Sequence, residues 1–571
     1  MNAAAPTAES SPLIAALRDP ARYAHPVVRI DVLETHISWV ILTGQYAYKI
    51  KKPVNLGFLD FSTLEARRSC CEEELRLNRR LTPSLYIAVV KITGSAGSPH
   101  VGGGDADIAG DATALEYAVK MREFAQNTLA GSLLAQGVLT GTHFDTLAAR
   151  IAAFHAGTGI AARGCPYGTP EMVITSARDN FAALDDLLPD PADQARIAPL
   201  RDWTEHEYHT RQTLFSERHQ VEGYIRECHG DLHLGNIVML EGTLTPFDGI
   251  EFNPALRWID VMSEVAFLVM DLMDRGRADF ATGFLNAYLE AGGDYAGLDV
   301  LRFYLVYRAL VRAKVHALRA AQDGIAAAGR ARLINASRHY IELAQRCARS
   351  THNTHNAPGA IILMHGVSGS GKSVIAQALA AHTGAIRLRS DVERKRLNGF
   401  APLARSGSTP GCGIYAGDLT LATYNRLLDL ARRIAHAGYT VIVDATFLKF
   451  WQRDLFRRQA QNRGVPFAIV DVTAPEAMLR TRIAARLDAG ADASEADQAV
   501  LTHQLAQREA LTGDESSTAL SIDTTRADVT AIVHEAVAAL VERGITPDQG
   551  ALGHAGNAMG NGACFRTAKI V

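Results

Sequence analysis

The sequence predicts two domains of different construction, a bilobal α+β domain followed by an α/β domain with a parallel sheet. A chain of 571 residues is too long for a single hydrophobic core. Within residues 26–349, short strand-like segments come first and a long, mostly helical stretch follows. From residue 360 onward, strands and helices alternate, which is typical of a parallel sheet with crossover helices.

The composition is that of an ordinary globular protein. With 47% hydrophobic and 21% charged residues, and with no apolar run long enough to span a bilayer, we expect a soluble, cytoplasmic protein. A formal net charge of -3 argues against a general nucleic-acid-binding surface. Residues 1–10 lack the basic and apolar regions of a secretory signal. The seven cysteines form no C-x-x-C pair, so we expect reduced thiols.

The predicted domain boundaries follow from segments rich in residues that break helices and strands. Residues 1–25 are predicted to be a loose leader, and the polar residues 350–359, which include Pro and Gly, are predicted to be a linker. The predicted domains are therefore residues 26–349 and 360–545. Residues 546–571, rich in Gly, Ala and Asn, are predicted to be a disordered tail.

The first domain begins with predicted strands and one helix. Short segments rich in β-branched or aromatic residues predict strands at residues 27–30, 37–42, 46–50, 87–92 and 116–121. Apolar positions at helical spacing, with charges on the opposite face, predict a helix over residues 64–81. Residues 144–349 are mostly helical in pattern, apart from a loop-and-strand region at residues 228–252.

That interruption holds the first cluster of chemically capable residues. Residues 229–236 are His-Gly-Asp-Leu-His-Leu-Gly-Asn, and residues 247–249 are Phe-Asp-Gly. Phosphoryl transfer requires a positioned hydroxyl group and a triphosphate neutralised by metal. Asp231 could accept the hydroxyl proton, and the oxygens of Asn236 and Asp248 could bind magnesium. We expect a short hairpin to bring Asp248 back beside Asn236.

These motifs resemble the catalytic loop of the aminoglycoside phosphotransferase and choline kinase group of kinase-like enzymes. The resemblance implies a bilobal protein-kinase-like fold, a base role for Asp231 and magnesium roles for Asn236 and Asp248. It also implies that Asp260 supports the catalytic loop. An inactive relic of the same fold is the alternative interpretation.

Further upstream, residues 46–49 resemble the strand that carries the ATP-phosphate-binding lysine of that group. The resemblance implies that Lys49 binds phosphate and that Glu74, in the following helix, orients it through an ion pair. The adenine-binding hinge is expected near residues 119–123. Neighbouring residues of the same types remain open as alternatives to these two: Lys51, Lys52, Glu72 and Glu73.

The second cluster follows a buried-strand pattern at residues 361–364. Strand, glycine-rich loop and helix follow one another in the order that a phosphate-binding P-loop, or Walker A motif, requires. Backbone N–H groups of the loop and the positive end of the helix would cradle phosphates, with Lys372 on the outer phosphates and Ser373 on magnesium. The predicted ATP-binding residues are Gly366, Val367, Ser368, Gly369, Ser370, Gly371, Lys372 and Ser373.

Acidic and basic residues downstream could complete this second site. Asp444 ends an apolar strand and suits a magnesium-side carboxylate, with a plain cap as the alternative. Asp391 ends another strand, at the sheet edge where ligands bind, and is the candidate base for a substrate hydroxyl. Arg482 and Arg486 share one face of a helix, which we interpret as a lid that brings arginine to the transferring phosphate. Solvated surface arginines are the alternative.

Residues 360–544 resemble the small P-loop kinases, a group that includes gluconate kinases, polynucleotide 5′-kinases and zeta-type toxins. The whole chain resembles bacterial proteins that join an aminoglycoside-phosphotransferase-like domain to a P-loop kinase-like domain. Together these resemblances imply a bifunctional phosphotransferase that uses ATP and Mg²⁺ to phosphorylate small-molecule hydroxyl acceptors. The alternatives are a nucleotide sensor in which one domain gates the other, end processing by a polynucleotide 5′-kinase-like activity, and antibiotic modification. We expect neither nucleic acid nor a membrane as a partner.

Overall fold

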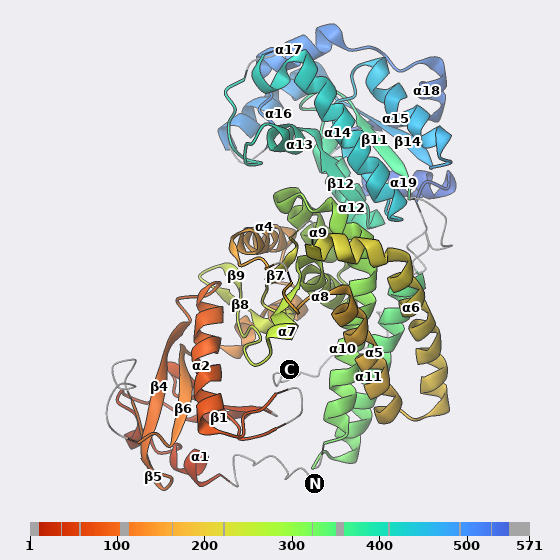
Figure 1. The fold of residues 1–571 in the computed structure, drawn as a ribbon. Helices are drawn as coiled ribbons and strands as arrows, with labels where there is room; N and C mark the ends of the chain where they lie inside the picture. The colour runs from red at the N-terminus through yellow and green to blue at the C-terminus, as the bar shows by residue number, and fades with distance from the viewer. Residues whose placement is uncertain are drawn as a thin grey trace. The chain divides into compact units, whose positions relative to one another are not determined.

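The computed structural model describes residues 11–546 except for 36, 56–58, 103–112, 163, 221–222, 323, 350–358, 409–411, 490–492 and 527. The described residues form two compact units (Figure 1). The first comes from Met1–Asp271 and Phe303–Ala344, and the second from Leu272–Arg302 and Gln345–Gly560. Most of the predicted linker (350–359) and tail (546–571), and residues 1–10 of the predicted leader (1–25), lie outside the described residues. The rest of the leader is not loose, because it contains helix α1 (Pro12–Ala16), whose Ile14 is buried in the same core as Trp39.

A six-stranded antiparallel sheet begins the first unit, in the order β1-β2-β3-β6-β4-β5. Helix α2 (Leu64–Arg79) lies against this sheet, with Cys71 in the same core as Val89 and Val119. Its start is fixed by Thr63, whose hydroxyl accepts a hydrogen bond from the amide of Ala66 at 3.1 Å. The strands are β1 (Asp31–Glu34), β2 (Ser38–Leu42), β3 (Tyr46–Lys51), β4 (Tyr86–Ser95), β5 (Ser98–Val101) and β6 (Glu116–Arg122).

The first predicted strand was misplaced. Residues 27–30 do not form a strand, and the chain instead pairs at Asp31–Glu34 with β2. The Thr35 hydroxyl accepts a hydrogen bond from the Ser38 amide at 2.9 Å, which tightens the turn between the two strands. This turn determines which residues of β1 and β2 face each other. The strand therefore forms next to the turn, at Asp31–Glu34, and not at the β-branched residues before it.

Helices make up most of the rest of the first unit, with two small two-stranded sheets between them. The predicted order, a mixed lobe followed by a helical lobe, is confirmed. The helices are α4 (Gly141–Gly157), α5 (Pro170–Leu187), α6 (Pro191–Gln220), α8 (Val261–Asp274), α10 (Leu298–Ala320) and α11 (Ala327–Arg349). The small sheets pair β7 (Ile225–Glu227) with β10 (Trp258–Asp260), and β8 (Ile237–Leu240) with β9 (Thr243–Pro246).

The second unit is built on a parallel sheet, as predicted, and the sheet has five strands in the order β12-β13-β11-β14-β15. Its central strands are apolar and fully buried, which is the pattern of a sheet covered by helices on both faces. The strands are β11 (Ile361–His365), β12 (Ile386–Arg389), β13 (Val441–Asp444), β14 (Phe467–Thr473) and β15 (Leu520–Asp523). The main helices are α12 (Lys372–Thr383), α13 (Ser390–Leu397), α14 (Gly417–His436), α15 (Phe450–Asn462), α16 (Glu476–Ala489), α17 (Gln498–Gln507) and α19 (Val529–Glu542).

Helix α9 (Ala278–Gly292) belongs to the second unit, although its sequence lies within the predicted first domain. The Asn286 side chain accepts a hydrogen bond from the Arg387 amide at 2.6 Å and donates one to the Ala385 carbonyl at 3.0 Å. These are the two backbone groups that a further strand would pair with beside the edge strand β12. Glu290 also pairs with Arg387 and Arg389, so α9 closes that edge of the sheet.

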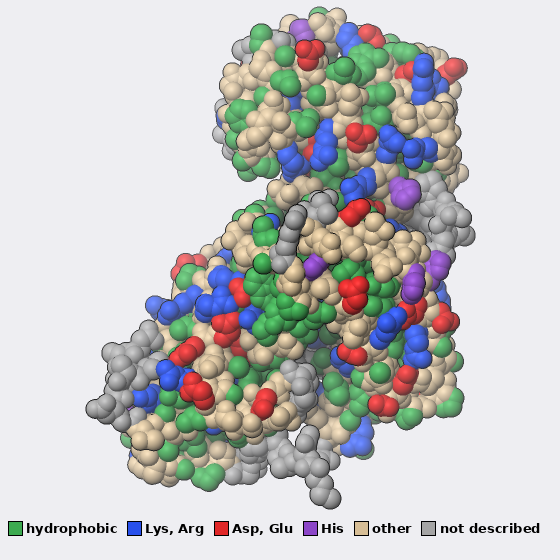
Figure 2. All heavy atoms as spheres, in the orientation of Figure 1, with side chains coloured by type: hydrophobic (Ala, Val, Ile, Leu, Met, Phe, Trp, Pro, Cys, Tyr) green, Lys and Arg blue, Asp and Glu red, His purple; other side chains and the backbone are tan. Residues whose placement is uncertain are grey.

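The helices of the two units differ in length and in apolar character. Among the described helices, none is both long enough and apolar enough to cross a membrane. On the face that Figure 2 shows, Lys and Arg side chains are interspersed with Asp and Glu.

Candidate active sites

Lys49 lies at the centre of a buried ion-pair cluster in the first unit. Its ammonium nitrogen lies 2.7 Å from Glu74 Oε1 and 2.7 Å from Asp248 Oδ1. Strand alternation turns Lys49 and Lys51 to the same face of β3, toward α2, and Lys51 pairs with Glu74 and Glu251. Burial alone would lower the pKa of Lys49. The carboxylates of Asp248, Glu74 and Glu251 together raise it by a larger amount, so the pKa lies well above its usual value. Lys49 is therefore charged.

Lys51 shares Glu74 with Lys49, whereas the remaining alternatives have other partners. Lys52 pairs with Glu34, while Glu72 pairs with Arg68 in the adjacent turn of α2. Glu73 pairs with Arg76 and Arg257. Of the lysines considered, Lys49 contacts the candidate metal ligand Asp248, and Glu74 contacts the same ammonium group.

Asp231 and Asn236 face each other across the tight loop that the sequence singled out. The Asn236 amide group donates to Asp231 Oδ2 at 2.6 Å, which turns the amide oxygen of Asn236 away from Asp231. His233 Nε2 lies 3.3 Å from the same carboxylate. Because His233 Nδ1 accepts a hydrogen bond from the Gly235 amide, the ring proton belongs on Nε2, the nitrogen nearer to Asp231.

The Asp231 carboxylate is held in its ionised form. Burial raises its pKa, but the nearby His233, Arg312 and His229 lower it, and the net shift is downward. The pKa of His229 is lowered, because the effect of burial outweighs its carboxylate neighbours and the hydrogen bond to Phe247. Its Nδ1 accepts the Asp231 amide at 3.3 Å, and its Nε2–H donates to the Phe247 carbonyl at 2.9 Å. An ionised Asp231 can accept or orient the proton of a hydroxyl group.

The hairpin of β8 and β9 returns Asp248 to Asn236, as we expected. Ile237 pairs with Pro246, and the Phe247 amide donates to the Asn236 carbonyl at 2.9 Å. Asp248 adopts a left-handed backbone with φ of 67°, which is costly for a residue with a side chain and often marks a functional position. The amide oxygen of Asn236 and the Asp248 carboxylate form a hard-oxygen donor set that suits Mg²⁺.

The resemblance implied that Asp260 supports the catalytic loop, but Glu264 accepts the amides of that loop. Asp260 instead pairs with Arg218 at 2.7 and 2.8 Å. Glu264, one helical turn later on α8, accepts the amides of His229 at 3.1 Å and Gly230 at 2.7 Å. Burial raises the pKa of Glu264, but the hydrogen bond from His155 and the charges around it lower it to about 2.

His155, Cys228 and Glu264 come close enough together to resemble a metal-binding group. Both carboxylate oxygens of Glu264 already accept backbone hydrogen bonds, and its Oε1 also lies 3.1 Å from His155 Nε2. Burial raises the pKa of the Cys228 thiol well above its ordinary value, which keeps it protonated. This cluster therefore holds the catalytic loop in place.

In the second unit, the predicted P-loop connects β11 to α12 and depends on its glycines. Gly369 has φ of +82°, and a Cβ atom there would lie 2.7 Å from the Leu479 carbonyl oxygen. Lys372 begins α12, and its ammonium group donates to the Val367 carbonyl at 2.8 Å. Burial lowers the pKa of Lys372 to about 8, although Asp444 and Asp391 act in the opposite direction.

Asp444 and Asp391 lie at the same edge of the parallel sheet as the P-loop. In the register between β12 and β13, Arg389 lies beside Asp444, so Asp391 follows two residues beyond that point. Asp444 Oδ2 is buried without a hydrogen-bond partner among the described residues, as is Ser370 Oγ in the loop. A buried carboxylate oxygen without a partner beside Lys372 fits a group that binds hydrated Mg²⁺. Ser373 is the second residue of α12.

The two arginines of α16 contact different parts of the site. Arg482 reaches the carbonyl oxygens of Gly369 and Ser370 at 3.4 Å and donates to Thr524 at 2.8 Å. Arg482 thus braces the carbonyl side of the P-loop in this arrangement. Arg486 donates to the Ala496 carbonyl at 2.6 Å.

Gln504 is a contact that the sequence analysis missed. Its side-chain oxygen on α17 accepts the Ser368 amide at 2.7 Å. This amide is one of those expected to bind phosphate, so the Gln504 oxygen takes the place expected for a phosphate oxygen. No local motif marks Gln504, because the contact joins residues 136 positions apart.

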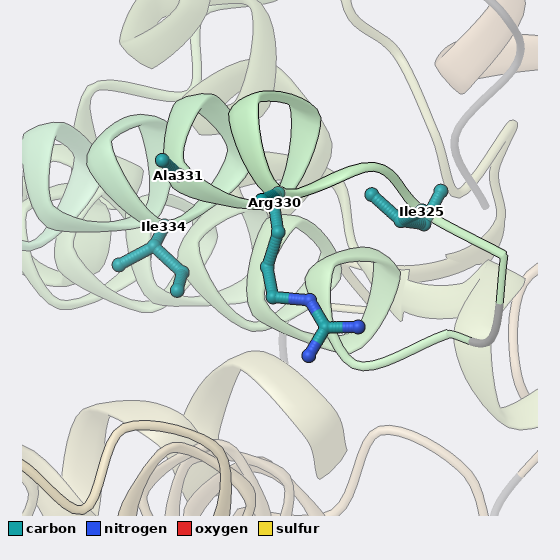
Figure 3. Close-up of a pocket in the computed structure, with 5 residues that line it drawn as sticks. Ile325, Arg330, Ala331 and Ile334 are labelled. Carbon is teal, nitrogen blue, oxygen red and sulfur yellow. The ribbon is translucent and has the colours of Figure 1, made fainter.

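A shallow hollow lies apart from these residues, at the start of α11 (Figure 3). It is lined by Ile325, Ala327, Arg330, Ala331 and Ile334. None of the predicted site residues is among them.

Known proteins resemble both parts of the chain. A family model described as "AAA domain" matches residues 361–511. The Mycobacterium tuberculosis (strain ATCC 25618 / H37Rv) protein printed as "Uncharacterized protein Rv2004c" is 30% identical over 477 residues, covering 82% of this chain and 90% of that protein. A gluconokinase structure from Sinorhizobium meliloti 1021 is 26% identical, covering 32% of this chain and 93% of its own, with a TM-score of 0.24. The amicoumacin kinase hAmiN, in complex with AMP-PNP, Ca²⁺ and Ami, is 16% identical, covering 57% of this chain and 89% of its own, with a TM-score of 0.33.

Proposed function

This chain belongs to the family of the Mycobacterium tuberculosis protein Rv2004c, and we propose that it is a bifunctional ATP- and Mg²⁺-dependent phosphotransferase acting on small-molecule hydroxyl acceptors. One observation carries the proposal. The buried Lys49, the candidate phosphate-binding residue, lies 2.7 Å from Asp248, a candidate metal ligand at the end of the hairpin that begins at Asn236. A lysine, a metal-type donor set and an ionised aspartate thus meet in one buried site.

In the first site, Asp231 would take the proton of the acceptor hydroxyl. The acceptor oxygen would form a bond to the γ-phosphorus, while the bond from that phosphorus to the β–γ bridging oxygen breaks and ADP leaves with the electron pair. Asn236 and Asp248 would hold Mg²⁺, which neutralises charge on the triphosphate. Lys49 would bind phosphate oxygens, and His233 would hold Asp231 in position.

In the second site, the P-loop amides and Lys372 would bind the triphosphate, with Ser373 and Asp444 as the metal-binding pair. Asp391 would accept the hydroxyl proton, since it lies at the carboxyl edge of the sheet with the P-loop. Nucleotide phosphates would also favour the charged form of Lys372 against the cost of burying it. The same bond to phosphorus would form, and the same bond would break, as in the first site.

Two single substitutions test the proposal in the full chain. Asp231→Asn should remove first-site turnover while leaving nucleotide binding, and Lys372→Met should weaken nucleotide binding at the second site. Each should remove a separable part of ATP consumption, measured with a panel of hydroxyl metabolites as acceptors. If neither substitution changes ATP consumption or nucleotide binding, the proposal is wrong.

A second candidate function, nucleotide sensing, is favoured by the position of α9. Its Glu290 pairs with Arg387 and Arg389, immediately before the candidate base Asp391, although α9 lies in sequence between α8 and α10. Glu290→Gln should then change nucleotide affinity at the first site as well as at the second. Unaltered and additive affinities in Glu290→Gln and Lys372→Met would remove the case for coupling.

A further inference from the structure

Helix α10 presents basic side chains at helical spacing beside the catalytic loop. Arg308, Arg312 and His316 follow one another at intervals of four residues, which places them on one face of the helix. Arg308 has a structural role, because its guanidinium donates to the Gly230 carbonyl at 3.3 Å and to the Ser263 carbonyl at 3.1 Å. Arg312, one turn further along, has the neutral Tyr340 side chain as a hydrogen-bonding neighbour.

Arg312 is buried without a matching anion among the described residues. Only 8% of the residue is exposed, and its Nε is buried without a hydrogen-bond partner in the described part of the chain. Its guanidinium lies 5.5 Å from the ring centre of Tyr340, on α11. The helices α10 and α11 run side by side (Figure 1), and the Ser337 hydroxyl donates to the Ala313 carbonyl at 2.9 Å.

The carboxylates near Arg312 are already engaged with the catalytic loop. Burial lowers the pKa of Arg312, whereas Tyr340, Asp271 and Asp231 raise it, and the net shift is upward. Asp271 accepts the Leu234 amide at 2.9 Å, and Asp231 accepts from Asn236. Asp271 and Asp231 favour the charged guanidinium from a distance, but no ion pair joins Arg312 to any residue that the structure describes, so no carboxylate contacts it directly.

We propose that Arg312 binds an oxyanion of the acceptor, so that the first site phosphorylates a hydroxyl compound that itself carries a phosphate or carboxylate group. This inference rests on the proposed function of the first site. The acceptor, rather than the nucleotide, is the source of the anion, because Lys49, Asn236 and Asp248 already provide for the triphosphate. Arg312 instead comes from the helical lobe, within electrostatic reach of the base Asp231. Planar guanidinium groups also suit phosphate and carboxylate oxygens in bidentate geometry.

The positive charge of Arg312 would favour anionic acceptors over cationic ones. A hydroxyl compound with a phosphate or carboxylate group gains an ion pair in a buried place, where such a pair is least screened. A cationic amino sugar would meet a like charge there. The first site is therefore assigned to anionic acceptors, and antibiotic modification of a cationic aminoglycoside type is not expected.

Binding of inorganic phosphate to the full chain tests the inference. The background is Lys372→Met, to weaken the P-loop, and the measurement is equilibrium dialysis of labelled phosphate with saturating Mg²⁺ and ADP. In this background, Arg312→Gln should weaken phosphate binding at least tenfold, and Arg312→Lys should weaken it less. The matched control is Arg319→Gln, on the same helix, which should leave phosphate binding unchanged.

Nucleotide affinity, measured in the same samples, separates the possible failures. ADP and ATP should bind to Arg312→Gln within twofold of the background, which also shows that the variant is folded. Phosphate binding that is absent, or that Arg312→Gln leaves intact, would overturn the inference while leaving the proposed function standing. Weaker ATP binding with unchanged ADP binding would also overturn it, by assigning Arg312 to the γ-phosphate. Failure of the background protein to bind Mg²⁺-nucleotide at the first site would overturn the proposed function and the inference together.

A second arm uses the acceptor reaction directly. Pairs of hydroxyl compounds that differ only in an anionic group, such as a sugar and its phosphate, are compared in the Lys372→Met background. Asp231-dependent turnover should be confined to the anionic members and should fall at least tenfold in Arg312→Gln. Equal turnover of the neutral members would contradict the assignment.

Discussion

Lys49 Nζ lies 2.7 Å from Asp248 Oδ1, which joins the candidate phosphate-binding residue to a candidate metal ligand in one buried contact. Glu74 holds the same ammonium group from α2 at 2.7 Å. The two lobes of the first unit therefore meet at a charge cluster, and the position of one functional group sets that of the next. Substitutions in this cluster should reduce nucleotide binding and turnover more than they alter the structure of the rest of the unit.

Replacing Lys49 tests this arrangement most directly. Lys49→Met keeps the length of the side chain but removes the charge that Glu74 and Asp248 share, so first-site turnover should fall at least a hundredfold. Initial rates with varied ATP, in the Lys372→Met background, provide the measurement. Lys52→Met is the control, since Lys52 pairs with Glu34, away from Asp248. Equal losses in both variants would show that Lys49 has no special role.

Because Lys372 is buried, both the free energy of unfolding and nucleotide affinity at the second site should depend on pH. Its pKa is lowered by burial from 10.5 to about 8, so below pH 8 the folded protein carries a buried charge at a cost of about 3 kcal/mol. Above pH 8 that cost falls, because the folded state releases the proton while the unfolded state keeps it up to about pH 10.5. Lys372→Met should therefore raise the free energy of unfolding of the nucleotide-free protein at pH 7, and the gain should shrink between pH 8 and pH 10.5.

Denaturant titrations of the full chain at several pH values would measure this difference. Nucleotide affinity at the second site should also fall as the pH rises past 8, because the uncharged amine attracts phosphate less strongly. A stability gain that is constant from pH 7 to pH 10.5 would contradict the explanation by buried charge.

Glu264 predicts a loss of stability in acid. Its pKa is lowered from 4.5 to about 2, since the favourable contacts of the carboxylate outweigh burial. The carboxylate therefore contributes about 3 kcal/mol above pH 4.5, and this contribution is lost as the pH falls toward 2. Glu264→Gln should cost a similar amount at pH 7, because an amide NH₂ group would oppose one of the two backbone N–H donors.

The control for Glu264 is Glu72→Gln, because Glu72 forms an exposed pair with Arg68 that contributes little. Unfolding free energies at pH 7 and pH 3 would be compared. The Glu264→Gln protein should also lose first-site turnover, since Glu264 holds the amides of His229 and Gly230. A variant as stable as the parent at pH 7 would show that the loop is supported in another way.

The P-loop glycine Gly369 can be tested against a matched glycine. Both Gly369 and Gly399 have positive φ, +82° and +74°, so alanine strains the backbone by about 1 kcal/mol at either position. At Gly369 the new Cβ would also lie 2.7 Å from the Leu479 carbonyl, whereas at Gly399 nothing lies within 4 Å among the described residues. Gly369→Ala should abolish nucleotide binding at the second site, measured by titration, and Gly399→Ala should preserve it. Equal binding by both variants would argue against a role for the loop conformation.

The sequence predicts local features well in this protein. The resemblance to kinase-like enzymes pointed to the contact between Lys49 and Glu74, and a short hairpin was enough to return Asp248 to Asn236. In the second unit, the alternation of strands and helices was enough to predict the parallel sheet. These features depend on residues close together in the chain, where spacing determines direction.

Contacts between distant residues were harder to predict. Asp260 ends β10 and Glu264 lies four residues later on α8, and only packing against the catalytic loop shows which of the two accepts its amides. Gln504 accepts the amide of Ser368, which lies 136 positions earlier in the sequence, and no local motif predicts this contact. The placement of α9 likewise depends on Asn286 meeting β12, a partner that periodicity does not identify.

The α9 contact means that the P-loop unit is assembled from two separated stretches of the gene. A clone that begins after residue 360 would leave the Ala385 carbonyl and the Arg387 amide at the margin of β12 without Asn286. A bare sheet margin recruits strands from neighbouring molecules. Expression of that half alone should therefore favour aggregates, and exchange of halves between relatives by a single crossover would separate pieces that must be inherited together.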